Sequence, residues 1–174
     1  MTGRGYLAQV RFLIVDDNAF SRQLVRRIIA QFGARDIHEA GDGEQAKNQT
    51  ISFKPDIIIC DWAMKPLDGM QFVHWLREGE DSPAPFTPVI MVTSYSHITN
   101  IMQARDAGIN EFLAKPISAK SLFMRIQAVI DKPRQYVRAD EYFGPDRRRR
   151  DMPHRDEKRH DFLEDDDDIV DLGP

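Results

Sequence analysis

The feature that most constrains this chain is a short apolar run, Ile57–Cys60, which follows Pro55 and Asp56 and ends at Asp61. The run has no polar alternation, which is typical of a strand buried on both faces in a parallel sheet covered by helices. Because an ionised carboxylate is costly to bury, Asp61 is expected at the exposed carboxyl end of this strand. In open α/β sheets, ligands bind at that edge. The run therefore predicts both a fold class and the position of a site.

Three further apolar segments also end at charged or hydroxyl-bearing residues. Parallel strands end at the same edge of a sheet, so these residues are expected to lie close together. Carboxylates, a hydroxyl and an amine gathered at one edge favour a functional site over isolated surface charges. The segments and the residues that follow them are Phe12–Val15 with Asp16 and Asp17, Val89–Val92 with Thr93, and Phe112–Ala114 with Lys115.

Segments with helical periodicity alternate with the predicted strands, and a half-polar edge strand is predicted at Ile37–Ala40. This alternation predicts an α/β fold in which a parallel sheet has right-handed crossovers and helices on both faces. The first helix has Phe20, Leu24, Ile28 and Phe32 at four-residue spacing, with Val25 and Ile29 beside them, which predicts one apolar face. The predicted helices are Ala19–Phe32, Glu44–Phe53, a helix from Asp68-Gly69 through Leu76, Ile98–Ala107, and a helix from Ser118 through Ile130.

Length and composition predict one domain followed by a charged tail. Residues 10–131 are expected to form the domain, and residues 1–9 a flexible amino terminus. From residue 132 to residue 174 the apolar residues become sparse and lose their periodicity, so a disordered tail is expected. This tail contains a basic run, Arg147–Arg150, and an acidic run, Asp165–Asp168.

The remaining composition excludes several classes of protein. The single cysteine, Cys60, permits no internal disulfide, and its place in a buried strand favours an inert thiol. No apolar stretch approaches the length that spans a membrane, and no signal peptide is recognised, so a cytoplasmic protein without membrane insertion is expected. The net charge of -4 argues against general affinity for nucleic acid.

Residues from about Val10 to Ile130 resemble the receiver domain of the two-component response regulators, in particular the single-domain chemotaxis type. The resemblance implies a doubly wound, flavodoxin-like fold with five parallel strands in the order 2-1-3-4-5 and five helices. The residues that carry it are Asp16-Asp17, Asp61, Asp68-Gly69, Thr93, Phe112 and Lys115-Pro116, each at the place in the chain where the family has it.

The resemblance implies that Asp61 is the phosphoacceptor, which receives a phosphoryl group from the phosphohistidine of a partner kinase. Asp17 and Asp61 would bind Mg²⁺ directly, Asp16 would bind it through water, and the backbone carbonyl of Ala63 would complete the protein ligands. A few carboxylates with several waters suit this ion. Phosphoryl transfer depends mainly on positioning and charge neutralisation, which such a site supplies.

The resemblance also implies how the phosphoryl group is sensed. Lys115 would pair with a phosphoryl oxygen, and Thr93 would donate its hydroxyl to the group. Phe112 would then swing inward and change the surface of the fourth helix, fifth strand and fifth helix. In relatives the bond corresponding to Lys115-Pro116 is cis.

The chain departs from the family pattern near the acceptor. The family usually has a proline four residues after the phosphoacceptor, whereas here Lys65 stands there and Pro66 follows. The positions that tune hydrolysis of the phosphoaspartate hold Ala63 and Tyr95. Because neither side chain is an acid or an amide that could orient water, slow self-dephosphorylation is expected.

The sequence therefore predicts a phosphorylation-switched interaction module that is not a dedicated enzyme and has no separate output domain. Its expected partners are a sensor histidine kinase or a histidine phosphotransfer protein and an unidentified effector, and it is expected to be a monomer or weak dimer. Alternatives are a phosphorelay shuttle, or a pseudo-receiver whose Arg147–Arg150 run binds a partner or nucleic acid. A dehalogenase-type phosphatase would need an acid at Ala63, and a flavin-binding protein would need a phosphate-cradling loop after the first strand.

Overall fold

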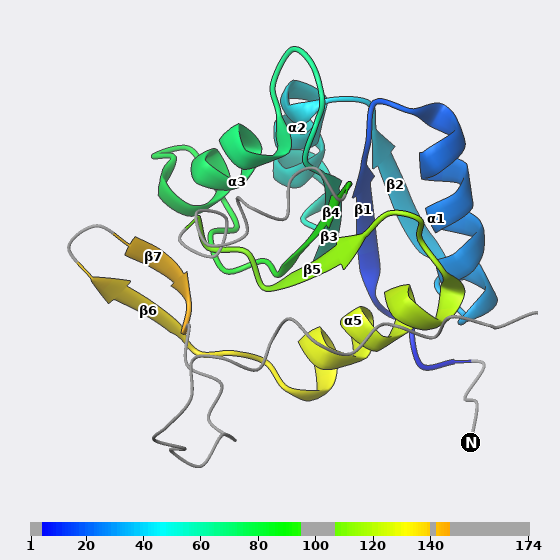
Figure 1. Ribbon diagram of the computed structural model, residues 1–174. Helices are drawn as coiled ribbons and strands as arrows, with labels where there is room; N and C mark the ends of the chain where they lie inside the picture. The colour runs from blue at the N-terminus through cyan, green and yellow to red at the C-terminus, as the bar shows by residue number, and fades with distance from the viewer. Residues whose placement is uncertain (1–4, 95–106, 140–141, 147–174) are drawn as a thin grey trace, which may run out of the picture.

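The structure is a computed structural model in which residues 5–94, 107–139 and 142–146 are described (Figure 1). Its centre is a five-stranded sheet in the order β2-β1-β3-β4-β5, and all four pairings within it are parallel. This confirms the predicted α/β fold and strand order. The strands are β1 (Arg11–Val15), β2 (Asp36–Ala40), β3 (Ile57–Asp61), β4 (Val89–Thr93) and β5 (Glu111–Ala114).

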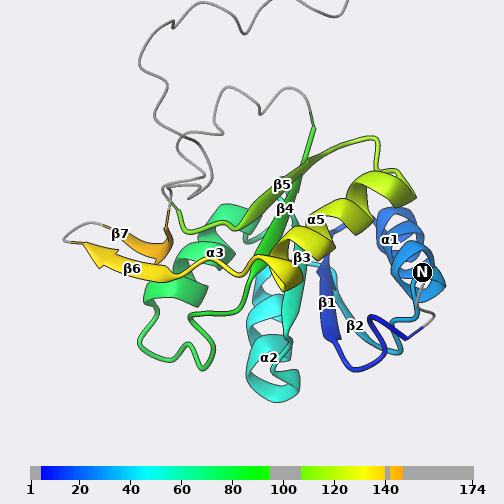
Figure 2. The same cartoon turned by 90° about the horizontal axis from the view of Figure 1, so that it is seen from below.

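Helices cover both faces of the sheet, with α1 and α5 on one side and α2 and α3 on the other (Figures 1 and 2). The helix predicted at Ile98–Ala107 falls almost wholly within residues 95–106, which lie outside the described part of the chain. Among the helices that are described, none is both long and apolar enough to cross a membrane. The described helices are α1 (Ala19–Gln31), α2 (Gly43–Phe53), α3 (Gly69–Glu78) and α5 (Ala119–Asp131).

Alternate residues of each strand pack into two separate apolar clusters. On the α1 and α5 side, Phe12 and Ile14 pack with Leu122, whereas on the α2 and α3 side Leu13 and Val15 pack with Phe72. Every residue of β3 is buried, as the unbroken apolar run predicts. Cys60 lies in this strand, and burial raises the pKa of its thiol well above the ordinary value, in agreement with the inert thiol that its position predicts.

The predicted apolar face of α1 is only partly correct. The buried residues of this helix are Val25, Ile28 and Ile29, which face the sheet. Phe20 and Leu24 remain exposed, with relative accessibilities of 86% and 46%. Four-residue spacing alone did not distinguish the core-facing stripe from the neighbouring one, because the helix carries apolar residues on both.

Both ends of the domain are more ordered than the sequence predicts. Leu7 is fully buried in the cluster under α1 and α5, and Tyr6 donates a hydrogen bond to Asp131. Burial of one leucine stabilises by about 1.5–3 kcal/mol, which offsets part of the entropy cost of ordering this short segment. The flexible segment predicted for residues 1–9 therefore does not include Leu7.

The tail predicted from residue 132 begins with a two-stranded antiparallel sheet. It consists of β6 (Tyr136–Ala139) and β7 (Tyr142–Pro145), and in both ribbon views it lies at the end of the molecule away from α1 and β2 (Figures 1 and 2). Disorder was the wrong prediction here because aromatic residues, not periodicity, hold the segment. Two of them, Tyr136 and Phe143, pack edge-to-face on Phe86.

Candidate functional site

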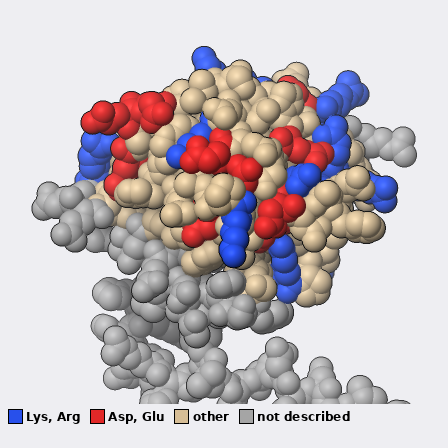
Figure 3. Space-filling view, turned by 90° about the horizontal axis from the view of Figure 1, so that it is seen from above, with Lys and Arg blue, Asp and Glu red and all other residues tan. Residues whose placement is uncertain are grey.

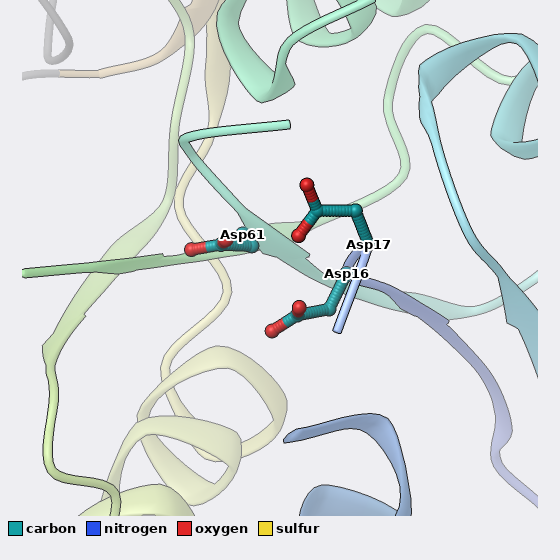
Figure 4. A group of neighbouring side chains, drawn as sticks. All are labelled: Asp16, Asp17 and Asp61. Carbon is teal, nitrogen blue, oxygen red and sulfur yellow. The ribbon is translucent and has the colours of Figure 1, made fainter. Parts of the chain in front are cut away.

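Three carboxylates meet at the carboxyl edge of the sheet. Asp16 and Asp17 are the two residues that follow β1, and Asp61 is the last residue of the neighbouring strand β3. Figure 4 shows the three side chains close together and extending to the same side, and one oxygen of each lies within 4.8 Å of the others. Asp16 and Asp61 are buried, whereas Asp17 is exposed. The group thus has one face open to solvent and two charges held inside.

The topology explains why the site lies between these two strands. After β1 the chain crosses to β2 on one side, and it later returns to β3 on the other side of β1. The connections diverge at this point and leave a crevice above the strand ends, where α/β folds bind ligands. In the view of Figure 3, acidic atoms gather near the middle of the face with basic atoms beside them.

Lys115 brings a positive charge to the carboxylates. It follows β5 directly, its backbone N–H donates to the carbonyl of Thr93, and the Lys115-Pro116 bond is cis as the resemblance implies. Its Nζ lies 3.2 Å from Asp61 Oδ1 and 3.3 Å from Asp16 Oδ2. Burial lowers the pKa of the Lys115 amine, but the attraction of the two carboxylates outweighs it and raises the pKa overall.

The surroundings of Asp61 disfavour the ionised form of its carboxyl group. Burial and the nearby charge of Asp16 raise the pKa of the Asp61 carboxyl, although Lys115 and the N–H of Trp62 act in the opposite direction. The backbone after Asp61 is fixed by close packing, because the N–H of Gly69 donates to the carbonyl of Trp62 at 2.9 Å. A Cβ at Gly69 would lie 2.2 Å from the backbone oxygen of Asp61. Glycine at this helix start therefore permits the observed approach.

Asp16 is fixed by groups that the sequence did not identify. Its Oδ1 accepts a hydrogen bond from the backbone N–H of Asn18 at 2.8 Å, and its Oδ2 accepts one from Ser21 Oγ at 2.5 Å. Arg22 donates to the backbone carbonyl of Asp16 at 2.6 Å. Asn18 itself caps α1 by accepting from the N–H groups of Phe20 and Ser21. Ser21, in the first turn of α1, was the sequence feature that could have indicated a hydrogen-bond donor for Asp16.

The remaining predicted site residues lie around this centre to different extents. Thr93 is the last residue of β4 and is buried, and its hydroxyl donates to the carbonyl of Ser94 at 3.2 Å. Phe112 is half-buried in β5 against the α2 and α3 cluster. Ala63 is exposed two residues after Asp61, and Tyr95 lies outside the described residues. The altered loop contains a cis Lys65-Pro66 bond, and the carbonyl of the next residue, Leu67, accepts a hydrogen bond from Gly43.

The donor set fits a hard divalent cation. Carboxylates are the ligands that Mg²⁺ prefers, and its usual coordination combines one or two of them with several waters. Asp17 offers an exposed carboxylate beside the two buried ones, so part of the coordination sphere would face solvent. Three clustered negative charges meet a single amine, Lys115, among the described contacts of the group. A divalent cation would relieve that imbalance.

Comparison with known proteins identifies relatives over most of the domain. Residues 12–127 match the family model of the response regulator receiver domain. The phosphate regulon transcriptional regulatory protein PhoB of Escherichia coli (strain K12) is 32% identical over 120 residues, which are 69% of this chain and 51% of PhoB. The match thus spans about half the length of that curated relative.

Solved structures show the same fold. The chemotaxis protein CheY4 of Vibrio cholerae superposes with a TM-score of 0.63 at 28% identity, over 70% of this chain and 99% of CheY4. The receiver domain of the Francisella response regulator 1452 superposes with a TM-score of 0.63 at 26% identity, over 71% of this chain and 98% of that domain.

Proposed function

Because this chain belongs to the response regulator receiver domain family of two-component systems, we propose that Asp61 accepts a phosphoryl group from a phosphohistidine on a partner protein. The observation that carries the proposal is the position of Asp61, which lies between a pair of carboxylates and the Lys115 amine at the carboxyl edge of the sheet. The donor would be a histidine kinase or a histidine phosphotransfer protein.

The chemistry assigns a role to each of these groups. A carboxylate oxygen of Asp61 attacks phosphorus, the bond from phosphorus to the imidazole nitrogen breaks, and that nitrogen keeps the electron pair. Lys115 Nζ lies 3.2 Å from Asp61 Oδ1 and would hold a phosphoryl oxygen. Bound Mg²⁺ would supply charge neutralisation for the transferring group, and Asp16, Asp17 and Asp61 would hold it, with the Ala63 carbonyl as a further ligand.

Transmission of the signal would involve Thr93 and Phe112. The hydroxyl of Thr93 donates a long hydrogen bond of 3.2 Å to the neighbouring Ser94 carbonyl, so a phosphoryl oxygen could replace that acceptor at low cost. Phe112 lies on the adjacent strand, and because its ring is only half-buried, it would become more buried if it moved inward. We propose that this change alters the surface that an effector protein recognises.

Intact mass after incubation with acetyl phosphate and Mg²⁺ tests the acceptor. The wild-type protein is expected to gain one phosphoryl group, and Asp61→Asn to gain none. Asp42→Asn is the matched control, because Asp42 caps α2 outside the carboxylate group and asparagine caps a helix equally well. A phosphorylated Asp61→Asn protein would show that another residue is the acceptor.

The acyl phosphate is expected to be long-lived. Ala63, two residues after Asp61, is exposed, and its side chain has no group to orient an attacking water. Decay of the phosphorylated protein after removal of the donor measures this directly by intact mass. A half-life of seconds would contradict the proposal, and introducing Ala63→Glu is expected to shorten the half-life.

The donor protein is proposed to contact the amino-terminal half of α1. Phe20 and Leu24 are exposed there, and α1 begins three residues after Asp16. Exposed apolar groups beside a reacting centre are suited to protein docking. Phe20→Ala is therefore expected to slow phosphorylation by a histidine phosphotransfer protein without changing phosphorylation by acetyl phosphate. Equal slowing with both donors would place Phe20 in the chemistry and not in docking.

A further inference from the structure

The β6–β7 hairpin contacts the domain through a buried arginine. Arg77, on α3, is buried and donates to the carbonyls of Gly108, Pro85 and Thr87 at 3.0, 2.8 and 2.8 Å. The ring of Tyr136 covers the guanidinium at 5.2 Å from ring centroid to Cζ. A guanidinium has five donors in a fixed fork, so these bonds set its orientation closely. Arg77 thus joins α3 to the hairpin.

The same contacts reach the start of β5. The side-chain oxygen of Asn110, one residue before the strand, accepts from Arg77, from the Tyr136 hydroxyl and from the backbone N–H of Val89. Glu111, the first residue of β5, accepts from Arg134 in the segment that leads into the hairpin and from Arg125 on α5. The beginning of β5 is therefore bound by the hairpin segment as well as by its own sheet.

The turn before β5 is also packed directly against β7. Gly108 has a φ of +84°, and a Cβ there would lie 2.9 Å from the carbonyl oxygen of Phe143. A Cβ at Gly144 would lie 2.6 Å from the Cα of Gly108. The two backbones approach so closely that only glycine fits at these positions. The hairpin therefore constrains the path of the chain as it enters β5.

This constraint matters because β5 is short and lies at an edge of the sheet. It has only four residues, and as an edge strand it pairs within the sheet with β4 alone. Lys115, which contacts Asp61 and Asp16, follows its last residue directly. A shift or opening of such a short strand moves both of its ends together.

We propose that residues 134–139 and 142–146 act as an intramolecular clamp that holds β5 and thereby positions Lys115 at the opposite end of the strand. Arg77 and Tyr136 are the positioning residues of this clamp. The hairpin is thus part of the working domain, although it lies beyond the residues that match the family model.

Amide hydrogen exchange of the full chain, followed residue by residue by NMR, tests the clamp. Three hydrogen-bonded amides serve as reporters: Asn110, which donates to Val89, Lys115, which donates to Thr93, and Asp56, which donates to Arg11 between β1 and β3. Tyr136→Ala is expected to speed exchange at Asn110 and Lys115 about tenfold relative to Asp56. The measurement needs no phosphoryl donor, so its result is independent of whether Asp61 is phosphorylated.

Three further variants separate the clamp from a general loss of stability. Phe143→Ala, which removes the second ring packed on Phe86, is expected to act like Tyr136→Ala. Tyr136→Phe keeps the ring over Arg77 and is expected to restore most of the protection at Lys115. Val137→Ala is the matched control, since this 38% exposed side chain lies on the opposite face of β6 from Tyr136.

The outcomes that overturn the proposal are equally specific. An unchanged exchange rate at Lys115 in both Tyr136→Ala and Phe143→Ala would show that the hairpin does not hold the strand. An equal rise at Asn110, Lys115 and Asp56 would show that the hairpin contributes only to global stability.

Discussion

Removal of the charge of Asp61 is predicted to stabilise the fold in the absence of Mg²⁺. At an effective dielectric constant of 20, Asp16 within 4.8 Å repels Asp61 by about 3–4 kcal/mol and Lys115 at 3.2 Å attracts it by about 5 kcal/mol. Solvent at the partly exposed Lys115 weakens the attraction, so the two contributions nearly cancel. The burial cost of the carboxylate is then left uncompensated, in agreement with the raised pKa of Asp61.

Asp61→Asn keeps the size and polarity of the side chain but removes the buried charge. We expect the free energy of unfolding at pH 7 to rise by about 1–2 kcal/mol, which corresponds to roughly 3–6 °C in melting temperature for a chain of this size. Thermal unfolding in EDTA, followed by circular dichroism, measures the difference. Asp42→Asn is again the control, with no change expected.

The sign of the pH dependence follows from the raised pKa. Because the folded protein binds the Asp61 proton more tightly than the unfolded chain, ionisation of Asp61 destabilises the fold above the folded pKa. That penalty disappears as the pH falls below the unfolded pKa, so the advantage of Asp61→Asn should shrink toward acid pH. Added Mg²⁺ should stabilise the wild type more than the variant. A less stable Asp61→Asn protein at pH 7 would refute the reasoning.

Three further perturbations have defined outcomes. Gly69→Ala should destabilise by about 2–3 kcal/mol in urea unfolding and slow phosphorylation, since its Cβ would displace the Asp61 backbone, whereas Gly41→Ala, whose nearest neighbour would be at 3.5 Å, should have little effect. Arg77→Met should destabilise by about 2–4 kcal/mol in the same assay, because buried carbonyls lose their donor. Lys115→Met should tighten Mg²⁺ binding about tenfold by calorimetry, since it removes a competing cation, yet reduce phosphorylation by acetyl phosphate; weaker Mg²⁺ binding would contradict this.

The sequence predicts the sheet and the site because both depend on local, unambiguous patterns. The unbroken apolar run ending at Asp61 favours a buried strand with a carboxylate at its exposed end, and the structure has this arrangement. Lys115 could be assigned to the same edge for the same reason, although its contact with both Asp16 and Asp61 required the three-dimensional geometry.

The predictions that failed depend on which surfaces meet. The α1 helix carries two apolar stripes, and only tertiary packing selects Val25 over Phe20 as the buried one. The hairpin has no periodicity to reveal it, because its stability comes from aromatic contacts with Phe86, a residue about fifty positions earlier in the chain. The buried Arg77 gave no signal either, since its acceptors are mostly backbone carbonyls, which have no sequence signature.

The near-balance of charges at the carboxyl edge explains how a small covalent change could have a large effect. Lys115 contributes attraction to both Asp16 and Asp61, so any group that binds the same carboxylates competes with these contacts. Lys115 is also tied through a short edge strand to a turn held by Arg77 and Tyr136. A new charge at Asp61 would therefore act on Lys115 at the carboxyl end of β5. The contacts of Arg77 and Tyr136 at the other end of β5 would oppose movement of the strand. Loosening the clamp should let β5 and Lys115 move more readily. The same movement would then occur without the phosphoryl group, so the moved conformation would be less specific to the phosphorylated protein.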